Sequence, residues 1–271
     1  FYAVPISIGA LVLPIMQFID SSMDIACLEA SGMGHQEALI QYGYLASYAM
    51  PIINLPFIIT TAVSASLVPT VANLMEQKDV AGVNHNIRTS LLLTILLMMP
   101  AAAGLATLGT PISDLLYDKA AAGPALSYVA FTVLAVGIYQ VSSGALQGLG
   151  HVMVPMSSLI MGAVIKGILN YVLLTMPGAD IRNAALATVI GFSFAALHNL
   201  FQLGRIVGKQ WFNAKQMVLK PVLATAAMAA CVLLIKNVLS GALVVTAIGI
   251  VVGVVSYFVV IFAVGGIDKD T

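Results

Sequence analysis

The chain has 271 residues; 60% of them are apolar, only 8% are charged, and 11 Lys and Arg balance 11 Asp and Glu. A soluble domain is about 45–50% apolar and about 25% charged, so a water-soluble fold would lack the polar surface to cover this composition. The composition excludes a soluble enzyme domain, a nucleic-acid-binding protein and a disordered segment. It leaves a polytopic membrane protein.

Eight apolar segments approach the length of about 20 residues that a helix needs to cross the hydrocarbon core. They lack the period-two alternation of membrane-spanning strands, so the sequence predicts an all-α bundle of eight transmembrane helices. In chain order, the predicted spans cover about residues 2–19, 43–72, 89–109, 125–147, 152–174, 183–203, 219–236 and 241–264.

The positions of Lys and Arg predict the orientation, because cytoplasmic loops carry an excess of both. We predict that both ends of this segment are cytoplasmic. We also expect both ends to be cut from a longer protein, because the chain starts without Met and stops just past an apolar run. With this orientation, the outside connections contain Lys119, Arg182 and Lys236, and the inside connections contain Lys78, Arg88, Arg205, Lys209, Lys215, Lys220 and Lys269.

The first connection, predicted over residues 20–37, carries acidic side chains and no Lys or Arg. Asp20 and Asp24 are four residues apart and would lie on one side of a helix that continues outward from the first span. Two interpretations remain open for this pair. It is a cation site or a cavity mouth, or it belongs to a solvated helix end.

Two prolines, Pro51 and Pro56, interrupt the second span, with Asn54 between them. Each proline removes a backbone donor and leaves a carbonyl free. In transporters, broken helices of this kind gather at substrate sites and hinges. The alternative to a hinge is a static kink that neighbouring helices stabilise.

Lys166 lies near the middle of the fifth span, where a lysine costs about 2.5–3.5 kcal/mol on insertion scales. Its ammonium group must therefore face a wet cavity or a carboxylate. One interpretation is a cation that lines a cavity for an anionic substrate. The other is a snorkelling side chain or a structural ion pair. Asn170 is one turn further along and shares the same helix face.

Other features predict contacts between helices. His198, late in the sixth span, is expected to bond a neighbouring helix rather than to shuttle protons. The small-residue steps Gly144–Gly148, Ala163–Gly167 and Gly249–Gly253 predict close helix packing.

The connection between the sixth and seventh spans is the most basic stretch and contains the single Trp, Trp211. We expect this loop to be an interfacial anchor among anionic headgroups. A regulatory or substrate-headgroup role is the alternative.

Motifs that would carry covalent chemistry are missing from the sequence. It contains no H-E-x-x-H, G-x-S-x-G or G-x-x-x-x-G-K-[ST] pattern, and Cys27 and Cys231 have no metal-binding spacing. We expect no enzymatic activity, no cofactor, no metal site and no nucleic-acid partner.

Several motifs resemble those of one family of membrane proteins. They are the run over residues 4–20, L-V-P at 67–69, L-Q-G-L-G at 146–150, Lys166 with L-N-Y at 169–171, and N-A-A-L-A-T at 183–188. With these motifs the chain resembles the polysaccharide-biosynthesis and stage-V-sporulation-protein-B branch of the MATE-like exporter (MOP) superfamily. That branch includes the lipid II flippases of Gram-positive bacteria.

The resemblance implies two six-helix lobes that face each other across a central cavity. Residues 1–206 would form the second lobe, and residues 207–271 a basic cytoplasmic loop with two additional helices. The first lobe, a partner from the same protein, is absent from this sequence. The implied function is alternating-access flipping of a polyprenyl-pyrophosphate-linked saccharide across the bacterial cell membrane. The candidate substrate-cavity residues are Lys166, Asn170, Asn54, Gln17 and Gln147.

Two alternatives to a flippase of lipid-linked saccharides remain. A cation-coupled multidrug exporter of the same superfamily would favour acidic residues in the cavity, and Lys166 without a mid-span carboxylate argues against it. A membrane scaffold for cell-wall enzymes, without transport, would leave Lys166 and the prolines of the second span without a role.

Overall fold

The computed structural model describes residues 17, 18, 20–208 and 210–265. This part of the chain consists of helices and short connections, and no strand occurs in it. Seven of its helical segments are long and apolar enough to cross a membrane. The first predicted span, about residues 2–19, lies almost entirely outside the described residues. The all-α membrane architecture is confirmed, and the count of eight spans is approximate.

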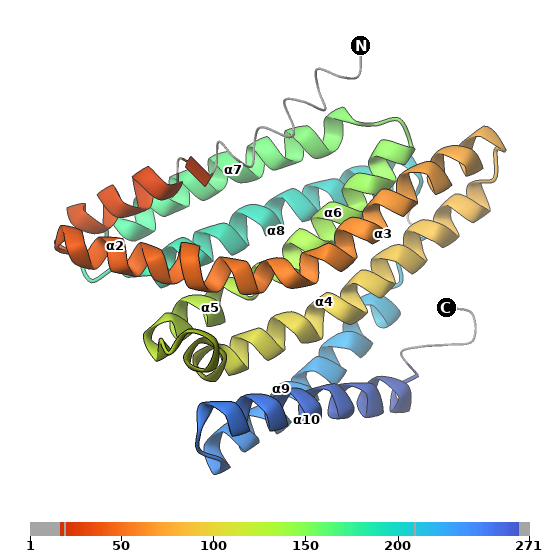
Figure 1. Ribbon diagram of the computed structural model, residues 1–271. Coiled ribbons are helices and arrows are strands. Elements are labelled where there is room, and N and C mark those ends of the chain that lie inside the picture. The colour runs from red at the N-terminus through yellow and green to blue at the C-terminus, as the bar shows by residue number, and fades with distance from the viewer. Residues whose placement is uncertain (1–16, 19, 209, 266–271) are drawn as a thin grey trace.

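The helices follow one another with few residues between them (Figure 1). A helix over residues 20–30 comes first. The labelled elements are α2 (His35–Gly43), the π-helix η1 (Tyr44–Ala49), α3 (Met50–Glu76), α4 (Val80–Tyr117), the 3-10 turn η2 (Ala120–Ala122), α5 (Gly123–Val129), α6 (Thr132–Gly148), α7 (Met153–Leu174), α8 (Ile181–Ile206), the π-helix η3 (Lys215–Leu219), α9 (Lys220–Val238) and α10 (Ala242–Ala263).

Two aspartates define where long helices begin. The side chain of Asp79 accepts a hydrogen bond from the backbone N–H of Gly82 at the start of α4. Asp180 does the same for the N–H of Arg182 at the start of α8. Each aspartate satisfies one of the free donors of a helix N-terminus, so both helices have fixed starting points.

The helix expected to continue outward through Asp20 and Asp24 is confirmed, but the connection predicted over residues 20–37 is too long. Residues 20–30 are helical, and α2 already begins at His35, so only residues 31–34 connect them. The cause is apolar burial: Cys27, Leu28 and Ala38 are all part of the protein core. The acidic residues of this stretch lie on helices whose other face is apolar.

The predicted break at Pro56 is also wrong, because α3 continues through Pro56 and Pro69. Pro51 lies in the first turn of α3, directly after η1, within one continuous helical segment over His35–Glu76. The irregular backbone comes one turn earlier, in the π-helix η1. π-helical turns are frequent at functional sites, and the hinge role of Pro51 and Pro56 remains a prediction.

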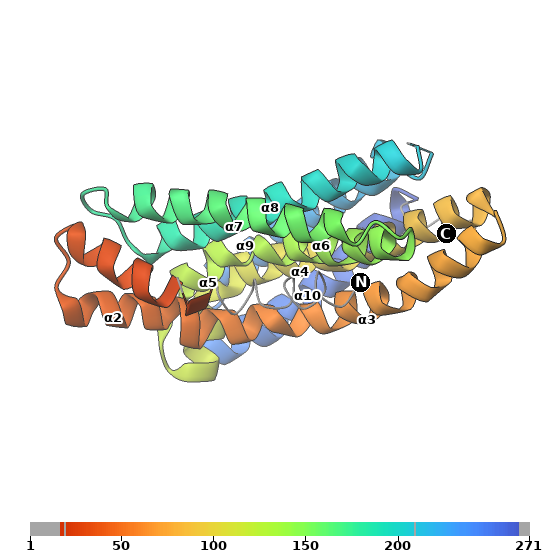
Figure 2. The ribbon, with the colours of Figure 1, turned by 90° about the horizontal axis from the view of Figure 1, so that it is seen from above.

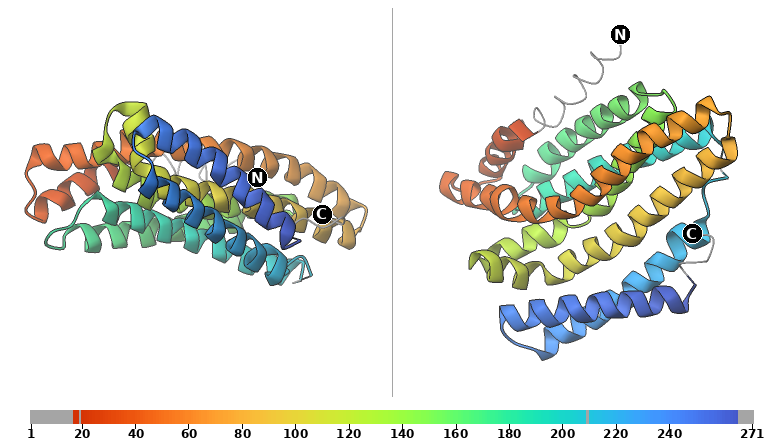
Figure 3. Two further views of the ribbon diagram at one scale, coloured as in Figure 1. Left: turned by 90° about the horizontal axis from the view of Figure 1, so that it is seen from below. Right: turned by 45° about the vertical axis from the view of Figure 1, so that its right-hand side comes forward.

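The long helices form a bundle in which α7, α8, α6, α3 and α4 lie side by side, and α9 and α10 pack together against α4 (Figure 1). Figures 2 and 3 show that the long axes of most of these helices share one general direction. Connections at one end of the bundle are residues 31–34, 118–119, 175–180 and 239–241, and those at the other end are 77–79, 149–152 and 207–214. This alternation agrees with the predicted order of inside and outside connections.

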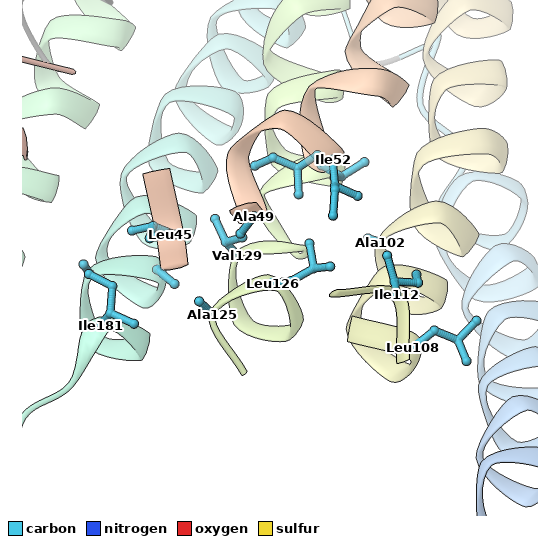
Figure 4. Close-up of a cluster of buried hydrophobic side chains, with 14 of the residues drawn as sticks. Leu45, Ala49, Ile52, Ala102, Leu108, Ile112, Ala125, Leu126, Val129 and Ile181 are labelled. Carbon is cyan, nitrogen blue, oxygen red and sulfur yellow. The ribbon is translucent and has the colours of Figure 1, made fainter. Parts of the chain in front are cut away.

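Apolar side chains form two buried clusters. The first joins η1, the start of α3, α4, α5 and α8; Figure 4 shows Ala49, Leu126 and Val129 facing one another at its centre. The second lies among α3, α4, α6 and α8, toward the opposite end of the bundle.

Trp211 belongs to the second cluster and is packed inside the protein, and the anchoring role expected for the loop around it remains a prediction. Its side chain is only 4% exposed and lies in a cluster with Ile87 of α4, Leu203 of α8 and Met217 of η3. The indole ring therefore contacts protein side chains. Its neighbour Phe212 is 46% exposed.

Close helix packing occurs at some of the predicted small residues. A Cβ at Gly144 would lie 2.6 Å from the Ser64 carbonyl oxygen, and one at Gly148 would lie 2.8 Å from the Val68 carbonyl oxygen. The predicted contact at Gly167 is wrong, since nothing lies within 4 Å of its position. The close approach on α7 is one turn away, at Gly162.

Candidate functional site

One face of α7 is buried along its whole length. Ser158, Gly162, Lys166, Asn170 and Leu174 are four residues apart and therefore stack along one side of the helix. Three of these five side chains are polar, which is unusual for the buried face of an apolar span. The groups that satisfy them identify the candidate site.

Lys166 is paired with a carboxylate. Its Nζ forms an ion pair with Asp20 Oδ2, and the lysine residue is only 5% exposed. Asp20 lies at the start of the helix of residues 20–30, far from Lys166 in the sequence. The long stem of Lys166 therefore does not carry its ammonium group to water. It carries the group to a neighbouring helix.

Asn170 forms a second contact of the same kind. Its Nδ2 donates a hydrogen bond of 2.7 Å to Asp24 Oδ1, and Asp24 is only 2% exposed. Because Asp20 and Asp24 are one turn apart, as are Lys166 and Asn170, the two helices meet at two successive levels. We call these four residues the polar cluster.

The polar cluster corrects two expectations. The solvated helix end proposed for Asp20 and Asp24 is wrong, because Asp24 is buried and both carboxylates have partners on α7. The statement that no carboxylate lies at mid-span is wrong for the same reason. The matched four-residue spacings were visible in the sequence, but nothing in it showed that these helices face each other.

The other predicted cavity residues lie elsewhere. Gln17, Asn54 and Gln147 are exposed, and the described hydrogen bonds do not connect them to the polar cluster. Gln147 is at the end of α6, and Asn54 is in the first turns of α3. Their role in a substrate cavity remains a prediction.

A second group of buried polar side chains joins α6, α7 and α8. Ser158 of α7 donates to Asn199 Oδ1 at 2.6 Å and lies 2.7 Å from His198 Nδ1. Asn199 Nδ2 donates to Ser143 Oγ of α6 at 2.9 Å. The expected bond from His198 to a neighbouring helix is confirmed. The sequence analysis missed Ser158 and Ser143, whose small polar side chains resemble ordinary packing residues.

The backbones of α7 and α8 approach closely just beside the polar cluster. A Cβ at Gly162 would lie 2.6 Å from the Gly191 carbonyl oxygen, and a Cβ at Gly191 would lie 2.9 Å from the Cβ of Lys166. Glycine at both positions therefore lets α8 support α7 where Lys166 emerges. Groups of three or more His, Cys, Asp and Glu side chains suited to a metal are not found in the described residues.

A family model described as lipid II flippase MurJ matches residues 43–260. The chain belongs to the lipid II flippase MurJ family. Among curated relatives, it is similar to the uncharacterized membrane protein YabM of Bacillus subtilis (strain 168), with 28% identity over 233 residues, or 86% of this chain and 42% of the relative.

Two further relatives come from the same organism. The lipid II flippase MurJ is 26% identical over 82% of this chain and 41% of its own length. Stage V sporulation protein B is 27% identical over 66% of this chain and 35% of its own length. The chain thus spans less than half the length of these curated relatives.

A solved structure of lipid II flippase MurJ in an inward closed conformation has the same fold. The TM-score is 0.71 at 21% sequence identity, and the match covers 92% of this chain and 51% of that structure. With seven membrane-length helices among its described residues, this member of the MurJ family is a multi-pass membrane protein of a flippase family.

This MurJ family member also has an apolar pocket of about 400 Å³. Its walls come from α3, α4, α9 and α10, so the C-terminal helix pair closes one side of it. The hydroxyl of Tyr257 does not make the pocket polar, because it donates to the Leu96 carbonyl oxygen at 2.9 Å. Residues that line the pocket include Pro56, Leu97, Pro100, Leu108, Met228 and Tyr257.

Proposed function

We propose that the chain is part of a flippase that moves a polyprenyl-pyrophosphate-linked saccharide of the lipid II class across the bacterial cell membrane. The family match over residues 43–260 is the observation that carries the proposal. The names of two relatives, lipid II flippase MurJ and stage V sporulation protein B, agree with a role in the bacterial envelope.

The proposed division of the chain follows the helix packing. Residues 1–206 form one six-helix lobe, and residues 207–271 form a basic loop and an additional helix pair. The pairing of α9 with α10, and their contact with α4, support this division. In the whole protein, a second lobe would face this one, and both ends of the present segment would be cytoplasmic.

The physical task is to move a charged sugar pyrophosphate through hydrocarbon, where each unpaired polar group costs several kcal/mol. Two lobes that alternately open to each side provide a hydrated path for the headgroup. The apolar pocket beside α9 and α10 supports a substrate with a lipid chain, because its walls offer hydrocarbon contacts. This movement requires no covalent step, so we infer transport without enzymatic catalysis.

In the state described here, the ammonium group of Lys166 is not available to bind the substrate. Its ammonium group is occupied by Asp20, so it can bind a pyrophosphate only after that ion pair opens. The exposed Asn54, Gln17 and Gln147 are candidates for contacts with the saccharide. Pro51 and Pro56, next to the π-helix η1, are candidates for the bend that such opening requires.

A cation-coupled multidrug exporter is the second candidate function, and the polar cluster favours it. Asp20 and Asp24 place two carboxylates beside one ammonium group, within helices that pack in the membrane. Acidic side chains of this kind suit the binding of cations or cationic drugs.

Complementation separates the two functions. The whole protein is expressed in bacteria whose own lipid II flippase is depleted, and we expect growth to be restored and lipid-linked precursor to stop accumulating. Tolerance to cationic drugs should not change. A gain in drug tolerance without restored growth would instead establish the exporter function.

A further inference from the structure

The charges of the polar cluster do not balance. It contains the carboxyl groups of Asp20 and Asp24 but only the ammonium group of Lys166. No other ion pair to either aspartate occurs in the described residues. Residues 1–16 include no Lys, Arg or His.

The two carboxyl groups are not equivalent. Asp20 has the ammonium group of Lys166 as its partner. Asp24 is more deeply buried, and the hydrogen bond that it accepts comes from the neutral amide of Asn170. An ionised carboxylate in such a place is costly, and among the described residues Asp24 has no cationic partner of its own.

An independent observation points to the identity of the missing ligand. Asn170 is fully buried, and its Oδ1 has no hydrogen-bond partner in the described structure. An unsatisfied buried acceptor costs about 1–3 kcal/mol. The same amide already donates its Nδ2 to Asp24. A hydrogen atom on Asp24 would supply the donor that this oxygen lacks.

We infer that Asp24 and Asn170 form a proton-binding site, in which the protonated carboxyl group of Asp24 and the amide of Asn170 are hydrogen-bonded partners. The cluster then contains one ammonium group, one carboxylate and one neutral carboxyl group, and its net charge is zero. The titratable side chains that act on Asp24 from the elements around it are Asp20 and Cys27 of the same segment, Tyr42 of α2 and Lys166 of α7.

Proton release would change how the helices pack. Loss of the proton leaves two carboxylates to share Lys166, and the helix of residues 20–30 then gains free energy by moving Asp24 toward water. Proton binding to Asp24 favours the contact of this helix with α7. If the proposed function is correct, a proton gradient could drive the lobe between its states through this contact.

Infrared spectroscopy tests the site without any substrate. The C=O stretching band of a protonated carboxyl group is separate from the bands of carboxylates. The whole protein is measured in lipid nanodiscs at neutral pH, and the spectrum of Asp24→Asn is subtracted from that of the unmodified protein. We expect one carboxyl band in the difference spectrum, and we expect it to disappear at high pH.

Three further variants locate and count the proton. Lys166→Met should double the band, because both carboxyl groups then need a proton. Asp20→Asn should remove it, because Asp24 then pairs with Lys166 as a carboxylate. Asn170→Ala should shift the band, whereas Asn54→Ala, at an exposed position, should leave it in place. Size-exclusion chromatography checks the folding of each variant. If Asp24→Asn fails to fold, Asp24→Glu replaces it, and this variant should retain a shifted band.

Two results would overturn the inference. One is the absence of a carboxyl band together with a stabilisation by Na⁺ that Asp24→Asn abolishes, which would assign a metal cation to the site. The other is a band that Asn170→Ala does not move, which would place the proton on Asp20. Because the measurement uses no lipid-linked substrate, failure of the proton site and failure of the proposed function are distinguishable.

Discussion

Lys166→Met will abolish most flipping by the whole protein and lower its thermal stability, and a second substitution, Asp20→Asn, will restore the stability but not the flipping. Removal of one partner from a buried ion pair typically costs about 3–5 kcal/mol, because the other group must remain charged without a partner or be neutralised by taking up a proton. Removal of both charges avoids this cost. Flipping stays low in the double variant, because the cation itself is missing.

The measurement compares melting temperatures in detergent and precursor flipping for the two single variants and the double variant. Lys236→Met is the matched control, because Lys236 is exposed and its described hydrogen bond is to the Thr107 carbonyl oxygen. We expect a change within about 0.5 kcal/mol for this control. Normal stability and flipping in Lys166→Met would show that the ion pair has no role in either.

Gly162→Ala will destabilise the protein strongly, although Gly167→Ala on the same helix will be neutral or stabilising. Both substitutions raise helix propensity by about 1 kcal/mol, so their difference isolates the contact between α7 and α8. The new Cβ at residue 162 would lie 2.6 Å from the Gly191 carbonyl oxygen, but nothing lies within 4 Å of the one at residue 167. Overpacking costs about 1–3 kcal/mol.

Thermal unfolding of the two variants checks this prediction directly. We also expect Gly162→Ala to reduce flipping, because α8 supports α7 beside Lys166. Equal melting temperatures for the two variants would contradict the close crossing of α7 and α8.

Apolar length was enough to predict most spans from the sequence. The predicted span over residues 152–174 corresponds to α7 (Met153–Leu174), and that over residues 183–203 lies within α8 (Ile181–Ile206). Length and hydropathy determine these elements because the hydrocarbon core allows few alternatives to a helix.

The errors share a physical cause, which is that composition does not reveal tertiary partners. The basic residues around Trp211 suggested an interface, but its indole ring is buried against α4 and α8. Asp20 and Asp24 were expected on a helix that continues outward, but the sequence did not show that Lys166 and Asn170 pair with them across a helix contact. Local sequence showed that Lys166 needs a partner, although it did not show which helix supplies one.

Reconstitution in liposomes tests the central claim most directly, namely that this chain is one lobe of a flippase for lipid-linked saccharides. A fluorescent polyprenyl-pyrophosphate saccharide is placed in one leaflet, and its appearance in the other leaflet is followed. We expect rapid flipping with the whole protein, and rates near those of protein-free liposomes with Lys166→Met or with residues 1–271 alone. The account would be contradicted if the whole protein flipped no faster than protein-free liposomes, or if residues 1–271 alone flipped as fast as the whole protein.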